Sequence, residues 1–547
     1  MIYPVIRNNN LNGEKLNIKS VKICGECIEL AERVFADSSI DTNGDFLIEI
    51  EISNTRKTTY IEEISKITDE KYLLNVTEKG VTVTASCEKG VFRALNTLCK
   101  LINKNELKTG ECEDYPLFST RGYIEGFYGK TWENEKRVSV MRLMAKYGMN
   151  TYFYAPKDDI YHREKWRDTY PETEYESLRM LFNEAKGNFL SFNWCVGPGL
   201  SYKYTSQEDF DLLINKFKSI YDMGVKGFGL LLDDIPWEFQ YEEDANAFEG
   251  IVDAHVKLVN DTYNALKAID SEIKLAVCPT QYSGDENGYY VSKFGKGIPS
   301  DVNMFWTGEE ICSRVLTVRE SQELLRSTDH RPLFWDNFPV NDCEMFQEMH
   351  LGALIGRDKD LYKACEGLIS NVMEYAECSK IPLMTIADYL WNPVDYNPDN
   401  SLKNAHTEIL GEKSEKFGYF ADHLGVSCLS KYSSAFMSEK LSHINFLLSQ
   451  GKTEQGFEEF KEYNQNMREC LVMLQDEGEP LFGELKKWTK KFGMCCDLLD
   501  AIYNAKKDPT DDNMKALAEL TEKYNSDGTI LTGFCLREMA EKTIGLY

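Results

Sequence analysis

Eight short apolar runs divide the middle of this 547-residue chain at fairly regular intervals. Each run ends in polar or glycine residues and precedes a segment with apolar residues at helical spacing. The runs lie at residues 122–129, 150–159, 189–199, 227–234, 274–282, 302–308, 332–342 and 367–373. Strand and helix alternating eight times over roughly 250 residues predict a (β/α)8 barrel. An open doubly wound sheet is the alternative, but no glycine-rich phosphate loop follows the first run.

Different patterns flank these runs. Residues 72–85 predict a β-hairpin that turns at 78–80, and residues 91–102 have the apolar spacing of a helix. Beyond about residue 400 the spacing is helical throughout, with stops at Gly411 and Gly451. The predicted fold class is therefore α/β. A TIM-type barrel over 118–400 is flanked by an α+β domain over 1–117 and a helical bundle over 401–547.

Residues just beyond the carboxyl ends of barrel strands surround the active-site mouth. Here this rule gathers charged, amide and aromatic side chains: Tyr128, Lys157, Asp158, Asp159, Asp233, Asp234, Tyr282, Trp335, Asn337, Asp342 and Asn371. Amides and carboxylates bind hydroxyl groups, and an aromatic ring covers the apolar face of a sugar, so the set predicts a carbohydrate site. The set includes no histidine or cysteine cluster, so we expect neither a catalytic metal nor another cofactor.

The stretch GLLLDDIP at 229–236 places two acidic residues side by side. Taken alone, Asp233 and Asp234 fit a helix N-cap as well as a catalytic pair. Neighbours on one strand cannot readily flank an anomeric carbon as the paired carboxylates of an ordinary retaining glycosidase do. They can support substrate-assisted hydrolysis, in which one carboxyl protonates the leaving oxygen and the other orients a 2-acetamido group that attacks the anomeric carbon. This interpretation requires an N-acetylhexosamine substrate.

Five motifs resemble those of the family 84 glycoside hydrolases: GYIEGFYGKTW, NTYFYAPKDD, LLLDDIP, CPTQY and LFWDNFPVND. The resemblance runs from about residue 120 to 395, and it includes the order of the motifs. That family contains protein O-GlcNAcases and bacterial β-N-acetylglucosaminidases, some of them labelled hyaluronidases. The resemblance therefore implies a barrel enzyme that acts on a glycan or glycoprotein containing N-acetylglucosamine.

The resemblance also implies a role for each matching position. Asp233 is expected to orient the acetamido group, Asp234 to act as general acid and then base, and Tyr282 to bind the acetamido oxygen. The other expected substrate contacts are the Gly126 backbone and the side chains of Lys157, Asn337, Asp342 and Asn371, with Tyr128 and Trp335 shaping the pocket. The expected function is a retaining exo-β-N-acetylglucosaminidase. An endo-acting hyaluronidase and a catalytically silent carbohydrate-binding scaffold are the alternatives.

Charge and composition limit the possible partners. The formal net charge is −27, which disfavours nucleic acid, anionic lipid and, more mildly, a polyanionic polysaccharide. No apolar run approaches the length of a membrane span, and the first residues lack the zones of a signal peptide. If the chain begins at its native start, we expect a cytoplasmic protein. If the chain has been trimmed, a secreted protein is the alternative. The oligomeric state is left open.

Overall fold

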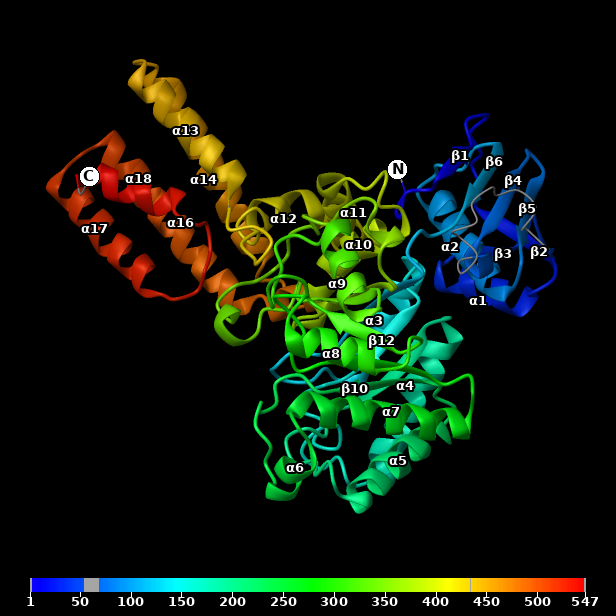
Figure 1. The fold of residues 1–547 in the computed structure, drawn as a ribbon. Coiled ribbons are helices and arrows are strands. Elements are labelled where there is room, and N and C mark those ends of the chain that lie inside the picture. The colour runs from blue at the N-terminus through cyan, green and yellow to red at the C-terminus, as the bar shows by residue number, and fades with distance from the viewer. Residues whose placement is uncertain (1, 54–67, 433, 546–547) are drawn as a thin grey trace.

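The computed structural model describes residues 2–53, 68–432 and 434–545, which form three lobes (Figure 1). A barrel occupies the middle, a sheet lobe made by the N-terminal residues lies on one side, and the C-terminal helices extend on the other (Figure 1). The predicted α/β fold class is confirmed. The proposed boundaries near residues 117 and 400 stay a prediction.

The barrel is closed by eight parallel strands in sequence order, with the last strand pairing with the first. The strands are β7 (Thr120–Ile124), β8 (Thr151–Tyr154), β9 (Ser191–Val196), β10 (Gly227–Leu231), β11 (Lys274–Cys278), β12 (Asn303–Trp306), β13 (Pro332–Asp336) and β14 (Gly367–Asn371). Seven of the predicted apolar runs contain one strand each, and the first run overlaps β7, which begins two residues before it.

Helices follow seven of the eight strands. They are α3 (Asn134–Lys146), α4 (Glu172–Gly187), α5 (Gln207–Tyr221), α6 (Glu242–Ala247), α7 (Ile251–Ile269), α8 (Tyr289–Gly297), α9 (Val318–Thr328) and α10 (Ala376–Trp391). The predicted alternation fails between β13 and β14. This fully described crossover forms only the 3-10 turns η4 (Cys343–Met345) and η5 (Leu361–Lys363), because Pro339 and Gly356, the latter at φ +77°, interrupt helical backbone.

Side chains fill the interior of the barrel, so it is a packed core and not a pore. The interior cluster consists of Ile124, Phe153, Ala155, Cys195, Leu231, Ala276, Cys278, Phe305, Leu333, Trp335 and Ile369. Within it the Trp335 and Phe305 rings meet edge to face, with centroids 5.3 Å apart. Tyr282, beyond the end of β11, packs against this cluster. The floor beneath the strand ends is therefore apolar and aromatic.

The N-terminal lobe is a six-stranded sheet in the order β1-β6-β4-β5-β3-β2. Its elements are β1 (Asn8–Asn10), β2 (Ser20–Gly25), α1 (Ile28–Asp37), β3 (Asp41–Ile52), η3 (Thr68–Glu70), β4 (Tyr72–Val76), β5 (Gly80–Ala85), α2 (Glu88–Asn103) and β6 (Gly110–Asp114). The predicted hairpin is confirmed as β4 and β5, since Val76 lies opposite Val81. The predicted helix is α2.

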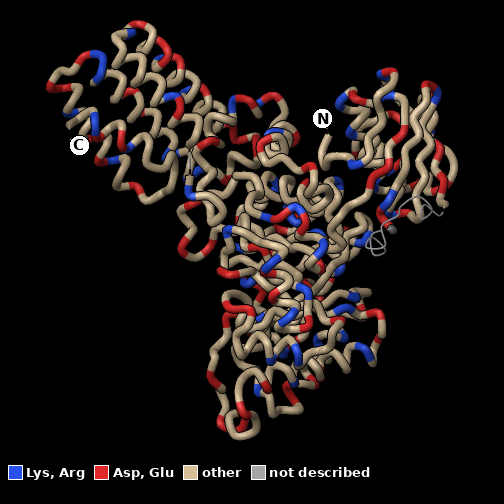
Figure 2. The backbone as a smooth tube through the Cα atoms, turned by 45° about the horizontal axis from the view of Figure 1, so that its top comes forward, with Lys and Arg blue, Asp and Glu red and all other residues tan. Residues whose placement is uncertain are grey.

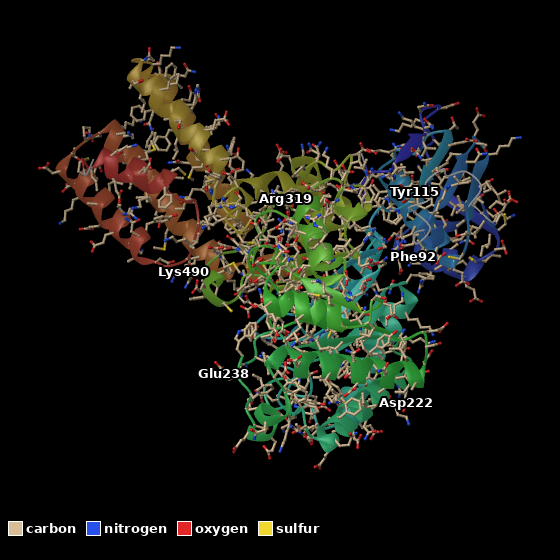
Figure 3. All side chains as sticks on the ribbon, viewed as in Figure 1. Phe92, Tyr115, Asp222, Glu238, Arg319 and Lys490 are labelled. Carbon is tan, nitrogen blue, oxygen red and sulfur yellow. The ribbon has the colours of Figure 1, made fainter. Side chains whose placement is uncertain are left out.

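Apolar and ionic contacts fix this lobe to the barrel. Phe92 of α2 (Figure 3) packs on Phe189, which follows α4, with ring centroids 5.1 Å apart. The buried Glu70 carboxylate accepts hydrogen bonds from Arg93 at 2.8 Å and from Arg121 of β7 at 2.5 Å. Because both guanidinium groups are also buried, the first barrel strand is joined to the N-terminal lobe by a desolvated charge cluster.

The C-terminal lobe is helical, as predicted. It comprises α11 (Pro398–Leu410), η6 (Gly411–Lys413), α12 (Ser414–Ala421), α13 (Ala435–Ser449), α14 (Thr453–Met473), α15 (Pro480–Glu484), α16 (Lys486–Lys507), α17 (Asp511–Ser526) and α18 (Cys535–Thr543). Among the helices of the described ranges, none has the length and apolar character needed to cross a membrane.

Candidate active site

A left-handed residue brings the two adjacent aspartates to the same mouth. Beyond β10 the strand pairing continues for one residue, because the Leu232 N–H donates to the Cys278 carbonyl at 2.8 Å. Asp234 then takes a φ of +51°, a region that costs most L-residues about 1–2 kcal/mol and that Asp tolerates better than most. This turn breaks the alternation of a strand. Asp233 and Asp234 can therefore both contact residues from neighbouring strand ends.

Asp233 forms a nearly buried ion pair with Lys157. The Lys157 Nζ atom donates to Asp233 Oδ2 at 2.9 Å, and the two side chains are 6% and 8% exposed. Burial opposes ionisation of Asp233, but the Lys157 ammonium outweighs it, so the pKa of the carboxyl lies below its ordinary value. Burial likewise opposes the charge of Lys157, but Asp233 raises the pKa of that amine. Asp233 is thus held as a carboxylate.

Asp234 is more exposed and accepts hydrogen bonds from two phenols. The Tyr128 hydroxyl donates to Oδ2 at 2.8 Å, and the Tyr282 hydroxyl donates to Oδ1 at 3.0 Å. Burial, together with the Asp234 charge, raises the pKa of Tyr282 above its ordinary value, and burial also raises the pKa of Tyr128. Both phenols therefore keep their protons, and each Asp234 oxygen has one donor.

A chain of amides lies across the floor of the mouth. Asn371 Oδ1 accepts from the Gly126 N–H at 3.1 Å, and Asn371 Nδ2 donates to Asn337 Oδ1 at 2.9 Å. The Trp335 indole donates to the same Asn337 oxygen at 2.9 Å. A Cβ atom on Gly126 would lie 2.4 Å from the Trp335 ring, so glycine is required for this close approach. These bonds fix the amide orientations and leave defined donors and acceptors for hydroxyl groups.

Asp342 reaches the mouth from the irregular crossover after β13. Its Oδ2 atom accepts from the Tyr128 backbone N–H at 2.7 Å. Burial raises the pKa of the Asp342 carboxyl. The contact joins the segment after β7 to the crossover after β13, and it places a third carboxyl beside Tyr128.

All ten residues that the resemblance singled out lie in one connected group. Asp233 contacts Lys157, and the Lys157 Nζ atom is 5.4 Å from the centroid of the Tyr128 ring. Tyr128 in turn contacts Asp234 and Asp342, and Asp234 contacts Tyr282. Tyr282 packs against the cluster that contains Trp335, and Trp335 leads to Asn337, Asn371 and Gly126.

The strand-end rule also gathered two residues outside this connected group. Asp159 accepts from the Tyr154 hydroxyl at 3.0 Å and from the Tyr170 hydroxyl at 2.6 Å. The prediction that Asp159 faces the mouth with Lys157 is wrong, because these two largely buried tyrosines hold its carboxylate instead. Asp158 is exposed, and its place at the mouth stays a prediction.

Arg163 is a residue of the mouth that the strand-end rule missed. Its NH1 group donates to the Tyr128 hydroxyl oxygen, and its NH2 group donates to the Asp234 carbonyl, both at 3.0 Å. Arg163 lies six positions beyond Lys157, in the long segment between β8 and α4. The only sequence signal was the high density of charged residues there.

Comparison with known proteins gives the family. The family model described as beta-N-acetylglucosaminidase matches residues 121–422, and a model of domain 2 of glycosyl hydrolase family 20 matches residues 25–115. Protein O-GlcNAcase of Rattus norvegicus is 29% identical over 274 residues, as is that of Mus musculus. Each match covers 49% of this chain and 29% of the relative, so it spans less than a third of those longer proteins.

Solved structures agree over longer spans. A mutant form of the Thermobaculum terrenum O-GlcNAc hydrolase superposes with a TM-score of 0.74 at 30% identity, covering 78% of this chain and 95% of that one. A protein named CpGH84B superposes with a TM-score of 0.85 at 25% identity, covering 99% of this chain and 100% of that one. The family model matches more than half of this chain, and the barrel and its acidic mouth agree with that match. This chain therefore belongs to the beta-N-acetylglucosaminidase family of glycoside hydrolases, family 84.

Proposed function

We propose that this protein is a retaining exo-β-N-acetylglucosaminidase that uses the acetamido group of its substrate as the nucleophile. The observation that carries the proposal is the adjacency of Asp233 and Asp234 at one mouth, with unlike surroundings. One carboxylate is buried against a lysine, and the other is exposed and bound only by neutral phenols. Two carboxyl groups with unlike environments suit two different roles.

Asp233 fits the role that needs a negative charge. The Lys157 ammonium keeps it ionised, so it can accept a hydrogen bond from the acetamido N–H and stabilise the positive charge that develops on that nitrogen. The acetamido oxygen then forms a bond to the anomeric carbon while the glycosidic bond breaks. Asp233 takes the acetamido proton in this step, so the product is a neutral oxazoline fused to the sugar ring, and Asp233 returns that proton when the ring is opened.

Asp234 fits the role that needs a proton to move. It gives a proton to the leaving glycosidic oxygen in the first step, and in the second it takes one from the water that opens the oxazoline. Tyr282 donates to Asp234 Oδ1 in the free enzyme, and in this proposal it donates to the acetamido oxygen once the substrate is bound. Two displacements at the anomeric carbon, each with inversion, give net retention.

The amide floor fits a terminal sugar. In this proposal Gly126, Asn337, Asn371, Asp342 and Lys157 supply the hydroxyl contacts, and Tyr128 and Trp335 shape the pocket. Relatives of this chain are named Protein O-GlcNAcase and O-GlcNAc hydrolase, which supports a β-linked GlcNAc on a glycan or glycoprotein as the substrate.

Two aryl glycosides and a series of chito-oligosaccharides test the proposal directly. The β-N-acetylglucosaminide should be hydrolysed with β-GlcNAc as the first product seen by NMR, and the matched β-glucoside, which lacks the acetamido group, should not be hydrolysed. Chito-oligosaccharides should lose single GlcNAc units. Release of internal fragments would favour the endo-acting alternative, and no hydrolysis of any substrate would favour the silent scaffold.

A further inference from the structure

Arg163 contacts the group around Asp234 at two points. Its two terminal nitrogens donate to the Tyr128 hydroxyl oxygen and to the Asp234 backbone carbonyl, at 3.0 Å each. The Tyr128 hydroxyl in turn donates to Asp234 Oδ2 at 2.8 Å. Arg163, Tyr128 and Asp234 therefore close a ring of hydrogen bonds that includes both the side chain and the main chain of the proposed acid.

We propose that Arg163 is a positioning residue that fixes the geometry of Asp234. This inference rests on the proposed function, because it assigns to Arg163 the control of the acid and base that function requires. Arg163 touches no reacting atom in this account and acts through Tyr128 and through the Asp234 backbone.

The first effect is on direction. A phenol oxygen that accepts from a guanidinium must point its own hydrogen elsewhere, and the Asp234 carboxylate is where Tyr128 donates. Arg163 thus decides which way the Tyr128 hydrogen points. The planar fork of an arginine can make both contacts at once, whereas a lysine ammonium is a single point of charge on a flexible stem.

The second effect is on the main chain. Asp234 has a φ of +51°, and the carbonyl of that same residue accepts from Arg163. A backbone conformation that most L-residues avoid persists when its surroundings hold it in place. Arg163 holds this carbonyl, so its removal allows Asp234 to relax away from the leaving oxygen.

The test compares two β-N-acetylglucosaminides on the full chain, one with a poor and one with a good leaving group. Arg163→Gln removes the charge and the fork, so kcat on the poor leaving group should fall about tenfold to a hundredfold, as expected for a misplaced catalytic group. A good leaving group needs little proton donation, so its kcat should fall much less. Arg163→Lys keeps the charge but not the fork, so it should show the same pattern.

Arg319 provides a matched control for the loss of one positive charge. It lies on α9 at the surface (Figure 3), and its side chain is 85% exposed. Arg319→Gln should leave kcat on both substrates as in the unmodified protein. Thermal melts of all three variants show whether each one folds. If Arg163→Gln does not fold, the leaving-group dependence of Arg163→Lys is the deciding measurement.

If the unmodified protein does not hydrolyse β-N-acetylglucosaminides, the proposed function fails. If the unmodified protein is active and both Arg163 variants match Arg319→Gln in kcat on both substrates, the proposed function stands and the role of Arg163 is overturned. Equal losses on the good and the poor leaving group would also overturn that role, because they would mean that Arg163 does not act through the acid.

Discussion

At the scale of the residue, the unlike roles of two neighbouring aspartates follow from one backbone angle and one cation. The left-handed φ of Asp234 turns its side chain toward Tyr128 and Tyr282, while Asp233 stays against Lys157. The sequence predicted most of the residues that the structure connects around Asp233 and Asp234, because strand ends in a barrel converge. It could not predict the φ of Asp234 or the contacts of Arg163, since both depend on tertiary structure and not on local pattern.

Replacing Asp234 with Asn should affect substrates according to their leaving groups. General acid catalysis contributes about 10²- to 10⁴-fold, and a leaving group that needs no proton does not use it. Asp234→Asn should therefore lose most activity on an alkyl or glycan aglycone and much less on a dinitrophenyl glycoside. Equal losses on both substrates, measured as kcat/KM, would assign the acid to Asp233 instead.

Chelation should leave the activity unchanged. The cation beside Asp233 is the Lys157 ammonium at 2.9 Å, and the proposed chemistry needs no Lewis acid. Dialysis against EDTA followed by assay should give the rate of the untreated protein. A large loss that zinc or calcium restores would contradict this prediction.

At the scale of the element, the periodicity predicted all eight strands, the hairpin β4–β5 and the C-terminal helices. It failed at the crossover from β13 to β14, where apolar residues such as Met345, Met349 and Leu351 form no α-helix. Pro339 and Gly356 outweigh the apolar pattern there. The irregular path has a functional consequence, because Asn337 and Asp342 reach the mouth on it.

Glu70→Gln should destabilise the junction of the N-terminal lobe and the barrel. Breaking a buried ion cluster costs about 3–5 kcal/mol, since it leaves Arg93 and Arg121 without their partner. Burial opposes the charge of Glu70, but Arg121, Lys89 and Arg93 hold its pKa well below the ordinary value of 4.5. Its stabilisation is therefore present above pH 4.5 and is lost as the pH falls further.

Urea unfolding at pH 7 and at acid pH measures this difference. The free energy of unfolding should differ most between Glu70→Gln and the unmodified protein at pH 7, and this difference should become smaller below pH 4.5. Glu176→Gln is the matched control, because its ion pair with Arg179 leaves both side chains 48% exposed and contributes about 0–1 kcal/mol. If this difference in free energy of unfolding does not change with pH, the stabilisation does not come from the Glu70 carboxylate.

At the scale of the whole molecule, acidic residues are spread along the backbone of all three lobes among the basic ones (Figure 2). The net charge of −27 repels polyanions at distances up to the Debye length, which is about 8–10 Å in physiological salt. At the mouth the cations Lys157 and Arg163 are already paired with Asp233 and with the Tyr128–Asp234 group. A substrate with repeated carboxylates therefore meets little compensating charge.

Hyaluronan should be a poor substrate and a weak competitor. Reducing-end assays on hyaluronan should show no release under conditions in which neutral chito-oligosaccharides lose GlcNAc. Hyaluronan added to a neutral substrate should inhibit little at low ionic strength, where repulsion is strongest. Efficient cleavage of hyaluronan would overturn the preference for neutral substrates and would support the endo-acting alternative.

In the proposed mechanism the substrate, and not a protein carboxylate, attacks the anomeric carbon. The decisive measurement is kcat/KM on aryl N-acylglucosaminides whose acyl methyl carries zero, one, two or three fluorines. Each fluorine withdraws electrons from the attacking oxygen, so kcat/KM should fall steadily across the series. Rates that do not change with fluorination would rule this mechanism out, because they would mean that the acetamido oxygen takes no part in the attack.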